Sequence, residues 1–496
     1  MAAAGLECLT SELFEMIVQR LDLSNVRNLR LVCRNVAFKA TQDTYRQFFR
    51  VKHVDLTRPG LETFAQLTSS GGLGCLVEHL TLVGIVYNPT LLENVVKSGK
   101  KSVLREGSSS YMVSRSCSEE ELKQARNDLE TMRRRQADLD ELRQQRVDVS
   151  LLKTALCNLA ANINHTPLKS LSLQIAVYRE NTKIKLSPSD GKCWKSVFEA
   201  TARSFVLAMS CLRDSKLPVE GLDIFAKKPE SLCCSLPCDT LNQLEWAVGF
   251  GPSFTTLKSL SISISDPIAD ESEYHARKSG DPAQKVPFEL IKQKRDRETL
   301  RALILDEGNV SGLCEMLSVC HHLEELELSA YALERSDSEL EDLQETMRRR
   351  YMDNLANHMM PLVQLRKLRI GGLSASQEDL LAFLRNHSSS LRGLELSSIS
   401  IDRGSFAPVM LCIRDMNLES IQLEDLWENG DLVLLNDEME SEYTKIGGDY
   451  LGQNVINITG ADTSNKIAYS PYRGPAVGSP KVRRWQQRKK MDFGRL

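Results

Sequence analysis

A short apolar pattern that returns along most of this chain is the feature that most restricts what it can fold into. Each copy has one apolar residue, two variable residues, and then an apolar, a variable and an apolar residue. Copies occupy residues 51–56, 77–82, 168–173, 257–262, 300–305, 323–328, 365–370, 391–396 and 418–423, with a looser copy at 219–224. Apolar residues at alternate positions line one face of a β-strand, so each copy predicts a strand with one buried face. Self-similarity of this kind predicts a repeat architecture.

The spacing between copies indicates the size of the repeating unit. Leu368 and Leu394, which are equivalent residues of neighbouring copies, lie 26 positions apart, and units of about 20 to 29 residues are typical of leucine-rich repeats. The segments between strands carry apolar residues at helical intervals, as at Leu380, Leu381 and Leu384. The sequence therefore predicts an α/β chain in which each unit contributes a strand, a turn and a helix.

Residues 9–49, which precede most of the copies, have the pattern of three short helices. The first begins near Ser11, where hydroxyl side chains can cap the free amides, and its apolar stripe is Leu13, Met16, Ile17 and Leu21. The second begins at Ser24 and the third covers 36–49. Three short helices make a small core. Surplus apolar surface on such a unit indicates a partner.

This helical run resembles an F-box. The matching residues are Leu9, Glu12-Leu13, Ile17, Leu21, Asp22-Leu23 and Arg30-Leu31-Val32-Cys33-Arg34. The run departs from the family pattern at Thr10, where the family usually has Pro, and at 35–37, where an aromatic residue often follows. The resemblance implies docking on the Skp adaptor of a Skp–cullin–F-box ubiquitin ligase, and through the adaptor on cullin. The residues expected to contact the adaptor are Leu9, Leu13, Phe14, Met16, Ile17, Leu21, Leu23, Leu29, Leu31 and Val32. The alternative is an ordinary small helical cap on a larger domain.

The whole chain resembles F-box proteins with irregular leucine-rich repeats of the fungal type. The resemblance implies an F-box at 6–50, a leucine-rich-repeat-like β/α solenoid at 51–426 and a partly disordered C-terminal tail at 427–496. The Asn or Cys that usually follows each repeat strand is missing, and Ile399 holds that place after Leu396. We therefore expect an uneven solenoid with helical and loop insertions.

Several segments read as insertions between the repeats. Residues 98–120 are predicted to be a mobile loop. Ser118 and the acidic residues after it predict the start of a long helix, in a charged helical insertion at about 118–150. The apolar stripe of this helix allows two interpretations: a coiled coil that forms a homodimer, or a charged helix that lies along the solenoid. Residues 266–297 are predicted to be a loop, and 336–350 a further charged helix.

Composition narrows the class of protein. The formal net charge of -3 gives no overall attraction to nucleic acid or to a membrane surface. The 13 cysteines are scattered and odd in number, the N-terminal residues lack a secretory pattern, and no stretch has the roughly eighteen apolar residues of a spanning helix. We expect a cytoplasmic or nuclear protein. The basic segment 481–490 is either a nuclear-localisation signal or a solvated terminus.

The motifs of common enzymes and metal sites are missing. The sequence has no nucleotide-binding glycine loop, no His-Glu-x-x-His and no Gly-x-Ser-x-Gly. Cys233, Cys234 and Cys238 form the densest thiol group, but no second pair stands at metal-ligand spacing. We therefore expect no catalytic residue, metal or cofactor, although an enzyme with an unrecognised site stays a third possibility.

The middle residue of each predicted strand points out of the concave sheet and indicates where a partner could bind. Reading this position along the chain gives Asp55 and Thr81, and then the residues expected to bind a protein substrate: Ser172, Asp223, Ser261, Ile304, Glu327, Arg369, Glu395 and Gln422. This row is net acidic, which favours basic groups on the target. The alternative is a solvated sheet face with recognition on the loops. The leading hypothesis is a substrate receptor of a ubiquitin ligase, and its rival is a non-catalytic scaffold.

Overall fold

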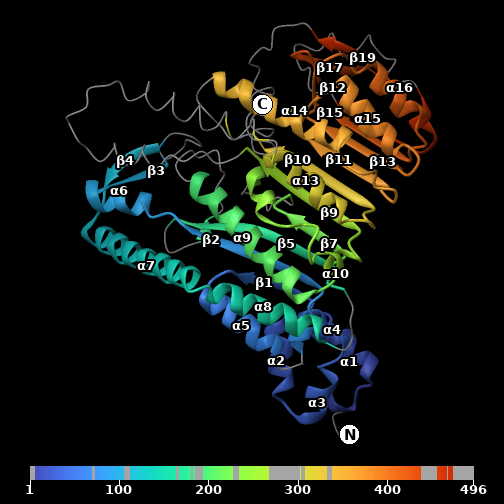
Figure 1. Ribbon diagram of the computed structural model, residues 1–496. Helices are drawn as coiled ribbons and strands as arrows, with labels where there is room; N and C mark the ends of the chain where they lie inside the picture. The colour runs from blue at the N-terminus through green and yellow to red at the C-terminus, as the bar shows by residue number, and fades with distance from the viewer. Residues whose placement is uncertain are drawn as a thin grey trace.

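One large and mostly parallel β-sheet, with helices along one of its faces, dominates the computed structural model of the chain (Figure 1). The structure describes residues 6–69, 73–104, 112–162, 167–179, 183–184, 194–226, 234–266, 302, 306, 308–331, 338–436, 455–465 and 467–472. The protein is therefore a mixed α/β protein.

The strands of the large sheet follow the order of the chain. They are β1 (Val51–Asp55), β2 (His79–Tyr87), β5 (Ser170–Tyr178), β7 (Gly221–Ile224), β9 (Ser259–Ser265), β10 (Glu325–Tyr331), β11 (Lys367–Gly371), β13 (Gly393–Ser397) and β15 (Ser420–Glu424). Each pairs in parallel with the next. The short strands β6 (Lys183–Ile184) and β8 (Leu236–Pro237) pair with β5 and β9. Nine of the ten predicted copies thus contribute a strand in the described part of the chain.

The register of the sheet matches the repeat pattern. The second apolar residue of each copy faces its equivalent in the next strand, which gives one continuous row: Leu80, Leu171, Leu222, Leu260, Leu326, Leu368, Leu394 and Ile421. Each of these side chains is at most 2% exposed. The strands therefore align because each buries the same apolar position under the covering helices.

Two details differ from the predicted array. Val54 pairs with Leu82 instead of Leu80, so β1 is displaced by two residues, a shift that keeps the same side chains on the buried face. The copy predicted at 300–305 lies mostly outside the described residues, and β9 pairs directly with β10.

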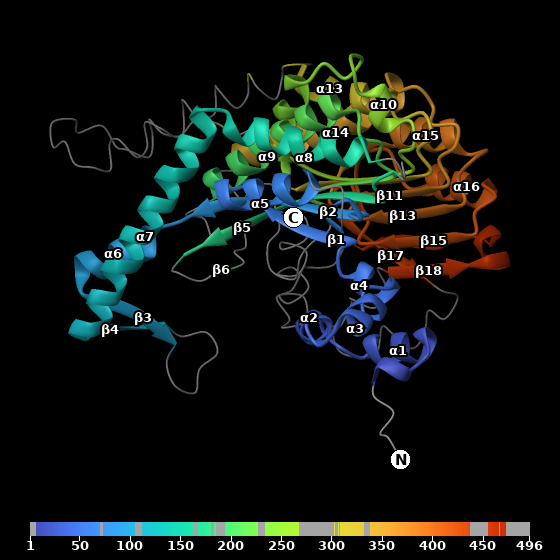
Figure 2. The same cartoon turned by 90° about the horizontal axis from the view of Figure 1, so that it is seen from below.

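Helices cover the outer side of the curved sheet (Figure 2). They are α5 (Arg58–Ser69), α8 (Val147–Ala160), α9 (Trp194–Ser215), α10 (Gly251–Phe254), α13 (Gly308–Ser318), α14 (Ser338–Asn357), α15 (Gln377–His387) and α16 (Ala407–Asp415), with the 3-10 turns η2 (Leu73–Cys75) and η4 (Cys238–Gln243). Between them and the sheet lies one continuous apolar core, in which Trp246 packs on Phe250 at 4.8 Å between ring centroids. The predicted charged insertion 336–350 is most of α14, and its buried Met347 and Tyr351 make it a covering helix of the core.

A second, smaller sheet follows the last parallel strands. It contains β12 (Ser374–Ser376), β14 (Ser400–Arg403), β16 (Trp427–Glu428), β17 (Asp431–Asn436) and β19 (Ala468–Tyr472). At each corner between the two sheets one residue has left-handed backbone: Gly372, Ser398 and Asp425. The Ser398 hydroxyl donates to Asp425 Oδ2 at 2.6 Å. Ile399 is buried in the next position, so an apolar side chain fills the place where the family usually has Asn or Cys.

Part of the predicted C-terminal tail belongs to the folded array. β17 and β19 pair with each other, and β18 (Val455–Thr459), followed by η7 (Gly460–Ser464), runs antiparallel to β15 at the end of the large sheet. The boundary predicted at residue 426 is therefore wrong. Residues 473–496, which include the basic segment, lie outside the described residues, as does most of the predicted loop 266–297.

The N-terminal helical unit (residues 6–50) contains η1 (Leu6–Cys8), α1 (Ser11–Val18), α2 (Leu23–Arg30), α3 (Arg34–Lys39) and α4 (Asp43–Gln47). It lies beside the β1 end of the array (Figure 1) and on the side of the sheet away from the covering helices (Figure 2). Thr10 caps α1, as predicted, and Asp22 caps α2 by accepting from Asn25 N at 2.8 Å. The third predicted helix is divided into α3 and α4.

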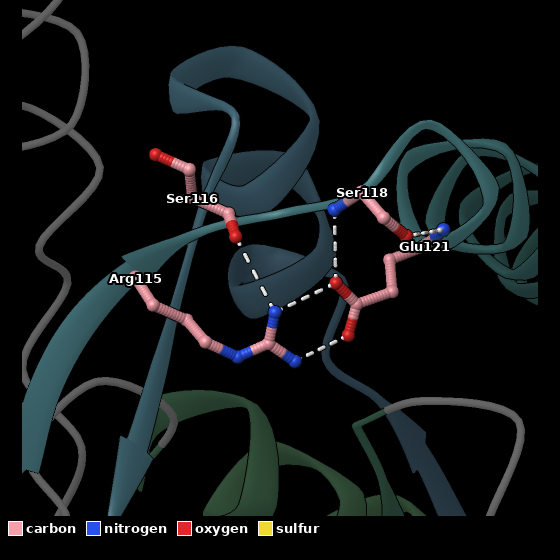
Figure 3. Close-up of polar contacts among 4 residues, drawn as sticks. All are labelled: Arg115, Ser116, Ser118 and Glu121. Carbon is pink, nitrogen blue, oxygen red and sulfur yellow. Dashed lines mark hydrogen bonds and ion pairs between the residues drawn. The ribbon is translucent and has the colours of Figure 1, made fainter.

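A side arm leaves the sheet after β2. It contains α6 (Thr90–Ser98), β3 (Lys100–Leu104), β4 (Met112–Ser116) and the long helix α7 (Glu119–Gln144). β3 and β4 pair antiparallel, so the segment predicted to be a mobile loop contains a hairpin. Ser118 and Glu121 form a capping box at the start of α7. The Arg115 guanidinium donates hydrogen bonds to both carboxylate oxygens of Glu121 (Figure 3).

The apolar stripe of α7 is buried against the protein's own chain. Leu129 and Met132 pack with Leu92 of α6, while Leu139 and Leu142 join the main core. These contacts occupy the stripe that a coiled-coil partner would need, which favours the interpretation of a charged helix packed on its own chain over the coiled coil.

Candidate functional site

The N-terminal helical unit has a core of its own and a separate exposed apolar surface. Phe14, Val18, Val26, Val36, Ala40 and Tyr45 form the core and are at most 3% exposed. On α1 the neighbouring apolar residues Leu13, Met16 and Ile17 remain 51%, 58% and 37% exposed. Leu31, Val32 and Phe38 after α2 and on α3 are 84%, 65% and 71% exposed. We call these six residues the exposed apolar surface; several large apolar side chains exposed on one small unit point to a protein-binding site.

Polar contacts hold the four helices around the small core. Glu15 of α1 accepts from the backbone amide of Thr44 at 2.6 Å, and Lys39 of α3 donates to the carbonyl of Leu9 at 2.5 Å. The Arg30 guanidinium lies 4.3 Å from the centre of the Tyr45 ring, a cation–π geometry. These contacts fix the orientation of α1, and with it the three exposed side chains that α1 contributes.

The ten residues predicted to contact an adaptor divide into three groups. Leu13, Met16, Ile17, Leu31 and Val32 are exposed, whereas Leu9, Leu21, Leu23 and Leu29 are half-buried against the core of the unit. Phe14 is 0% exposed. Its prediction as a contact residue is wrong, because its side chain fills the centre of the unit.

Phe38 is an exposed aromatic that the sequence reasoning missed. The F-box pattern places an aromatic close to the Arg-Leu-Val-Cys-Arg stretch, and residues 35–37 do not supply one. Phe38 stands one position later, on α3, where it is two residues from the buried Val36 and therefore points away from the core. Its position in the predicted third helix, two residues after Val36, was the sequence signal that could have identified it.

The second candidate surface is the row of side chains at the middle of the parallel strands, which we call the central row. The register places His53, Thr81, Ser172, Asp223, Ser261, Glu327, Arg369, Glu395, Gln422 and Asn457 side by side across the sheet. Seven of the eight predicted substrate-binding residues are therefore neighbours. Ile304 lies outside the described residues, and Asp55 lies one row away, opposite Val83.

Four neighbouring residues of the central row are buried, whereas His53 before them is exposed. Thr81, Ser172, Asp223 and Ser261 are at most 9% exposed. The Ser172 hydroxyl donates to Asp223 Oδ2 at 2.5 Å. Ser172, Asp223 and Ser261 are therefore not available on the surface, and the prediction that they contact a substrate is wrong for the folded chain.

The second half of the central row is accessible and internally paired. Glu327, Arg369, Glu395 and Gln422 are partly exposed. Arg369 Nε donates to Glu395 Oε2 at 2.5 Å, and an Arg369 guanidinium nitrogen lies 3.8 Å from Glu327 Oε2. Ser261 also donates to Glu327 Oε2, at 3.1 Å. The predicted acidic character is therefore weaker than the sequence indicated, because one arginine lies between the two glutamates.

The described cysteines do not gather into a metal site. Within the part of the chain that the structure describes, no group of three or more His, Cys, Asp or Glu side chains could hold a metal ion. Burial raises the pKa of the Cys238 thiol, and Cys234 is also buried; Cys233 lies outside the described residues. His322 Nδ1 lies 3.4 Å from the Gln364 amide.

Comparison with known protein families and with curated proteins finds no match to this chain. Among the described residues, no helix combines the length and apolar character needed to cross a membrane.

Proposed function

We propose that the protein is a substrate receptor of a Skp–cullin–F-box ubiquitin ligase. In this proposal the N-terminal helical unit is an F-box that binds the Skp adaptor, and the array is an irregular leucine-rich-repeat solenoid that binds a protein target. The protein itself performs no covalent chemistry. It raises the local concentration of target lysines near the ubiquitin-conjugating enzyme.

The observation that carries the proposal is the exposed apolar surface. A unit with a core of its own still leaves eight large apolar side chains exposed, and six of them lie on α1, after α2 and on α3. Five of those six are among the residues that the F-box resemblance had named. An ordinary helical cap would turn its surplus apolar residues toward the domain that it covers, so their exposure favours a separate partner.

The form of the array supports the second half of the proposal. The continuous row of buried leucines and the repeated left-handed corners at Gly372, Ser398 and Asp425 are features expected of stacked repeats, in which each unit contacts its neighbours. The accessible half of the central row, from Glu327 to Gln422, lies on the face without covering helices and is the surface that we assign to the target.

Binding of the purified full chain to a recombinant Skp adaptor tests the proposal. The variant Leu31→Asp/Val32→Asp places two charges on the exposed apolar surface, while Met360→Asp/Val363→Asp makes the same change at two residues that are each 75% exposed elsewhere. Burying an apolar side chain contributes about 1.5–3 kcal/mol. We therefore expect the first variant to lose at least about 100-fold in affinity and the control to bind like the wild type. No binding by the wild type, or equal binding by both variants, overturns the F-box assignment.

A second measurement separates a receptor from a scaffold that uses the adaptor outside a ligase. The wild-type chain and the adaptor are mixed with a recombinant cullin and analysed by size-exclusion chromatography. A receptor joins a stable complex of all three proteins, whereas a scaffold whose adaptor contact excludes cullin elutes with the adaptor alone.

A further inference from the structure

A cleft of about 700 Å³ opens on the helix-covered side of the array. Its walls come from the end of α7, the start of α8, one side of α9 and η4, far from the central row. Leu56, Val149, Val206 and Leu207 give it an apolar floor, and charged side chains lie around them. Ligand pockets commonly have volumes of about 300–1,000 Å³ with an apolar lining and a few placed polar groups.

The charges of the cleft do not balance. Three arginines line it, Arg143, Arg146 and Arg203, against four carboxylates, Asp140, Asp148, Glu199 and Asp239. Arg143 lies 3.5 Å from Asp140, and Arg203 lies 3.4 Å from Glu199. These arginines therefore already have carboxylate partners on their own helices. The surplus is one negative charge.

Among the residues that the structure describes, Asp239 is the carboxylate of the cleft that has no cation partner. Its Oδ1 is buried and accepts no hydrogen bond in the structure. Burial raises the pKa of Asp239, and only its own backbone amide opposes this. Burial raises the pKa of Asp148 as well, but the Val149 backbone amide and the charges of Arg143 and Arg146 oppose this increase. A buried ionised carboxylate without a donor is costly, so the place that a ligand can stabilise most is beside Asp239.

We propose that this cleft binds a ligand through a single ammonium or guanidinium group held by Asp239. The group is a monocation because the surplus charge is one, and it is a hydrogen-bond donor because Asp239 Oδ1 accepts no hydrogen bond. Thr240 and Gln243 on η4, and the apolar floor, contact the remainder of the ligand. The same group is present on a lysine or arginine side chain of a peptide and on a free polyamine.

Isothermal titration of the full-length protein with four probes tests the site and distinguishes the two sources. The probes are N-acetyl-arginine methylamide, N-acetyl-lysine methylamide, spermidine and N-acetyl-citrulline methylamide, which has nearly the shape of the arginine probe without its charge. We expect at least one cationic probe to bind at least tenfold more tightly than the citrulline probe. Tighter binding of the amino-acid probes identifies a peptide side chain as the source, and tighter binding of spermidine identifies a free polyamine. Equal binding of the arginine and citrulline probes, or no binding of any cation, overturns the proposal.

Two variants connect the binding to Asp239. Asp239→Asn keeps the shape and removes the charge, and it should lower the affinity of the cationic probe at least tenfold. Glu130→Gln neutralises an exposed carboxylate of α7 that does not line the cleft, and it should leave the affinity unchanged. The unliganded Asp239→Asn protein should also have a higher melting temperature than the wild type, because an uncompensated charge has been removed. Unchanged probe affinity in Asp239→Asn overturns the assignment of the cation to Asp239. A melting temperature of the unliganded Asp239→Asn protein below that of the wild type contradicts the inference that Asp239 carries an uncompensated charge.

Discussion

The buried histidine at the end of α15 gives a prediction that can be worked out in detail. His387 is 1% exposed, its Nδ1 lies 2.8 Å from the Phe383 carbonyl oxygen, and the Leu362 backbone amide donates to its Nε2 at 3.1 Å. A carbonyl can only accept and an amide can only donate. Both bonds therefore require the neutral imidazole with its proton on Nδ1, and protonation of Nε2 would break the bond to Leu362.

This arrangement makes stability depend on pH in a defined direction. Burial lowers the pKa of His387, and the hydrogen bond to Phe383 opposes this only in part. The contribution of His387 to folding is complete above the unfolded-state pKa of about 6.5. It is lost as the pH falls from there toward the lower folded-state pKa, because the unfolded chain binds the proton first. The loss is about 1.4 kcal/mol for each unit of pKa difference.

The variant His387→Phe tests this reasoning. It keeps a ring beside Phe383, whose centroid lies 4.7 Å from the histidine ring, but it leaves the Leu362 amide without an acceptor. An unsatisfied buried donor costs about 1–3 kcal/mol. We therefore expect a lower free energy of unfolding at pH 7.5 and faster amide exchange in a peptide that contains Leu362. The drop in stability between pH 7.5 and pH 5.5 should be smaller in the variant than in the wild type.

The control is His358→Gln, which changes an exposed histidine and should preserve the full pH dependence. All other histidines are common to the wild type and to His387→Phe, so the difference between the two proteins isolates His387. An identical drop in stability for both proteins would refute the assignment of a buried neutral imidazole.

Other variants probe the packing and the caps. Gly312→Ala should lower the free energy of unfolding by about 1–3 kcal/mol, because a Cβ there would lie 2.9 Å from Leu241 Cβ and 3.0 Å from the Leu241 carbonyl carbon. Urea denaturation measures this loss, and a variant as stable as the wild type would contradict it. Ser118→Ala should destabilise the start of α7 by about 1 kcal/mol, seen as faster amide exchange over the first turn. Arg115 holds the pKa of Glu121 at about 2, so the contribution of Glu121 to this turn should be complete above the ordinary carboxyl pKa of 4.5 and be lost progressively as the pH falls from there toward 2. Protection of this turn that does not change between pH 5 and pH 2 would argue against the ion pair. Arg369→Ala should leave Glu327 and Glu395 without their shared cation, so a basic test peptide should bind the central row more tightly. Fluorescence anisotropy measures this affinity, and weaker binding would show that Arg369 itself contacts the peptide.

The repeat pattern predicted most of the large sheet because each copy has one strongly apolar position. Leu368, Leu394 and Ile421 face one another in the structure as the pattern required. The displacement of β1 was not visible in the sequence, because a slip of two residues keeps the same alternation of buried and exposed side chains. The strands at 455–459 and 468–472 were read as tail because the surrounding Gly, Asn, Ser and Pro masked two short segments of extended chain.

The candidate sites were predicted less completely, since burial and pairing depend on contacts between distant elements. Phe14 and Leu13 are adjacent apolar residues of one helix, and only the packing of α2 to α4 determines that Phe14 is inside. The sequence places Arg369 between Glu327 and Glu395 in the row, but only the structure shows that its guanidinium group pairs with both carboxylates. The role of Asp239 could not be predicted from the sequence, because nothing near it in the chain indicates that α7, α8 and α9 line a cleft beside it.

The last strand of the large sheet has a consequence for shortened forms of the chain. β15 has its outer edge covered by β18, the strand at 455–459. A chain cut after residue 436 retains every parallel strand but leaves the amide and carbonyl groups of that edge unpaired. Open edges of this kind pair with strands of other molecules. We therefore expect truncation at this point to cause aggregation, with the solubility of the protein falling well before its parallel strands lose their structure.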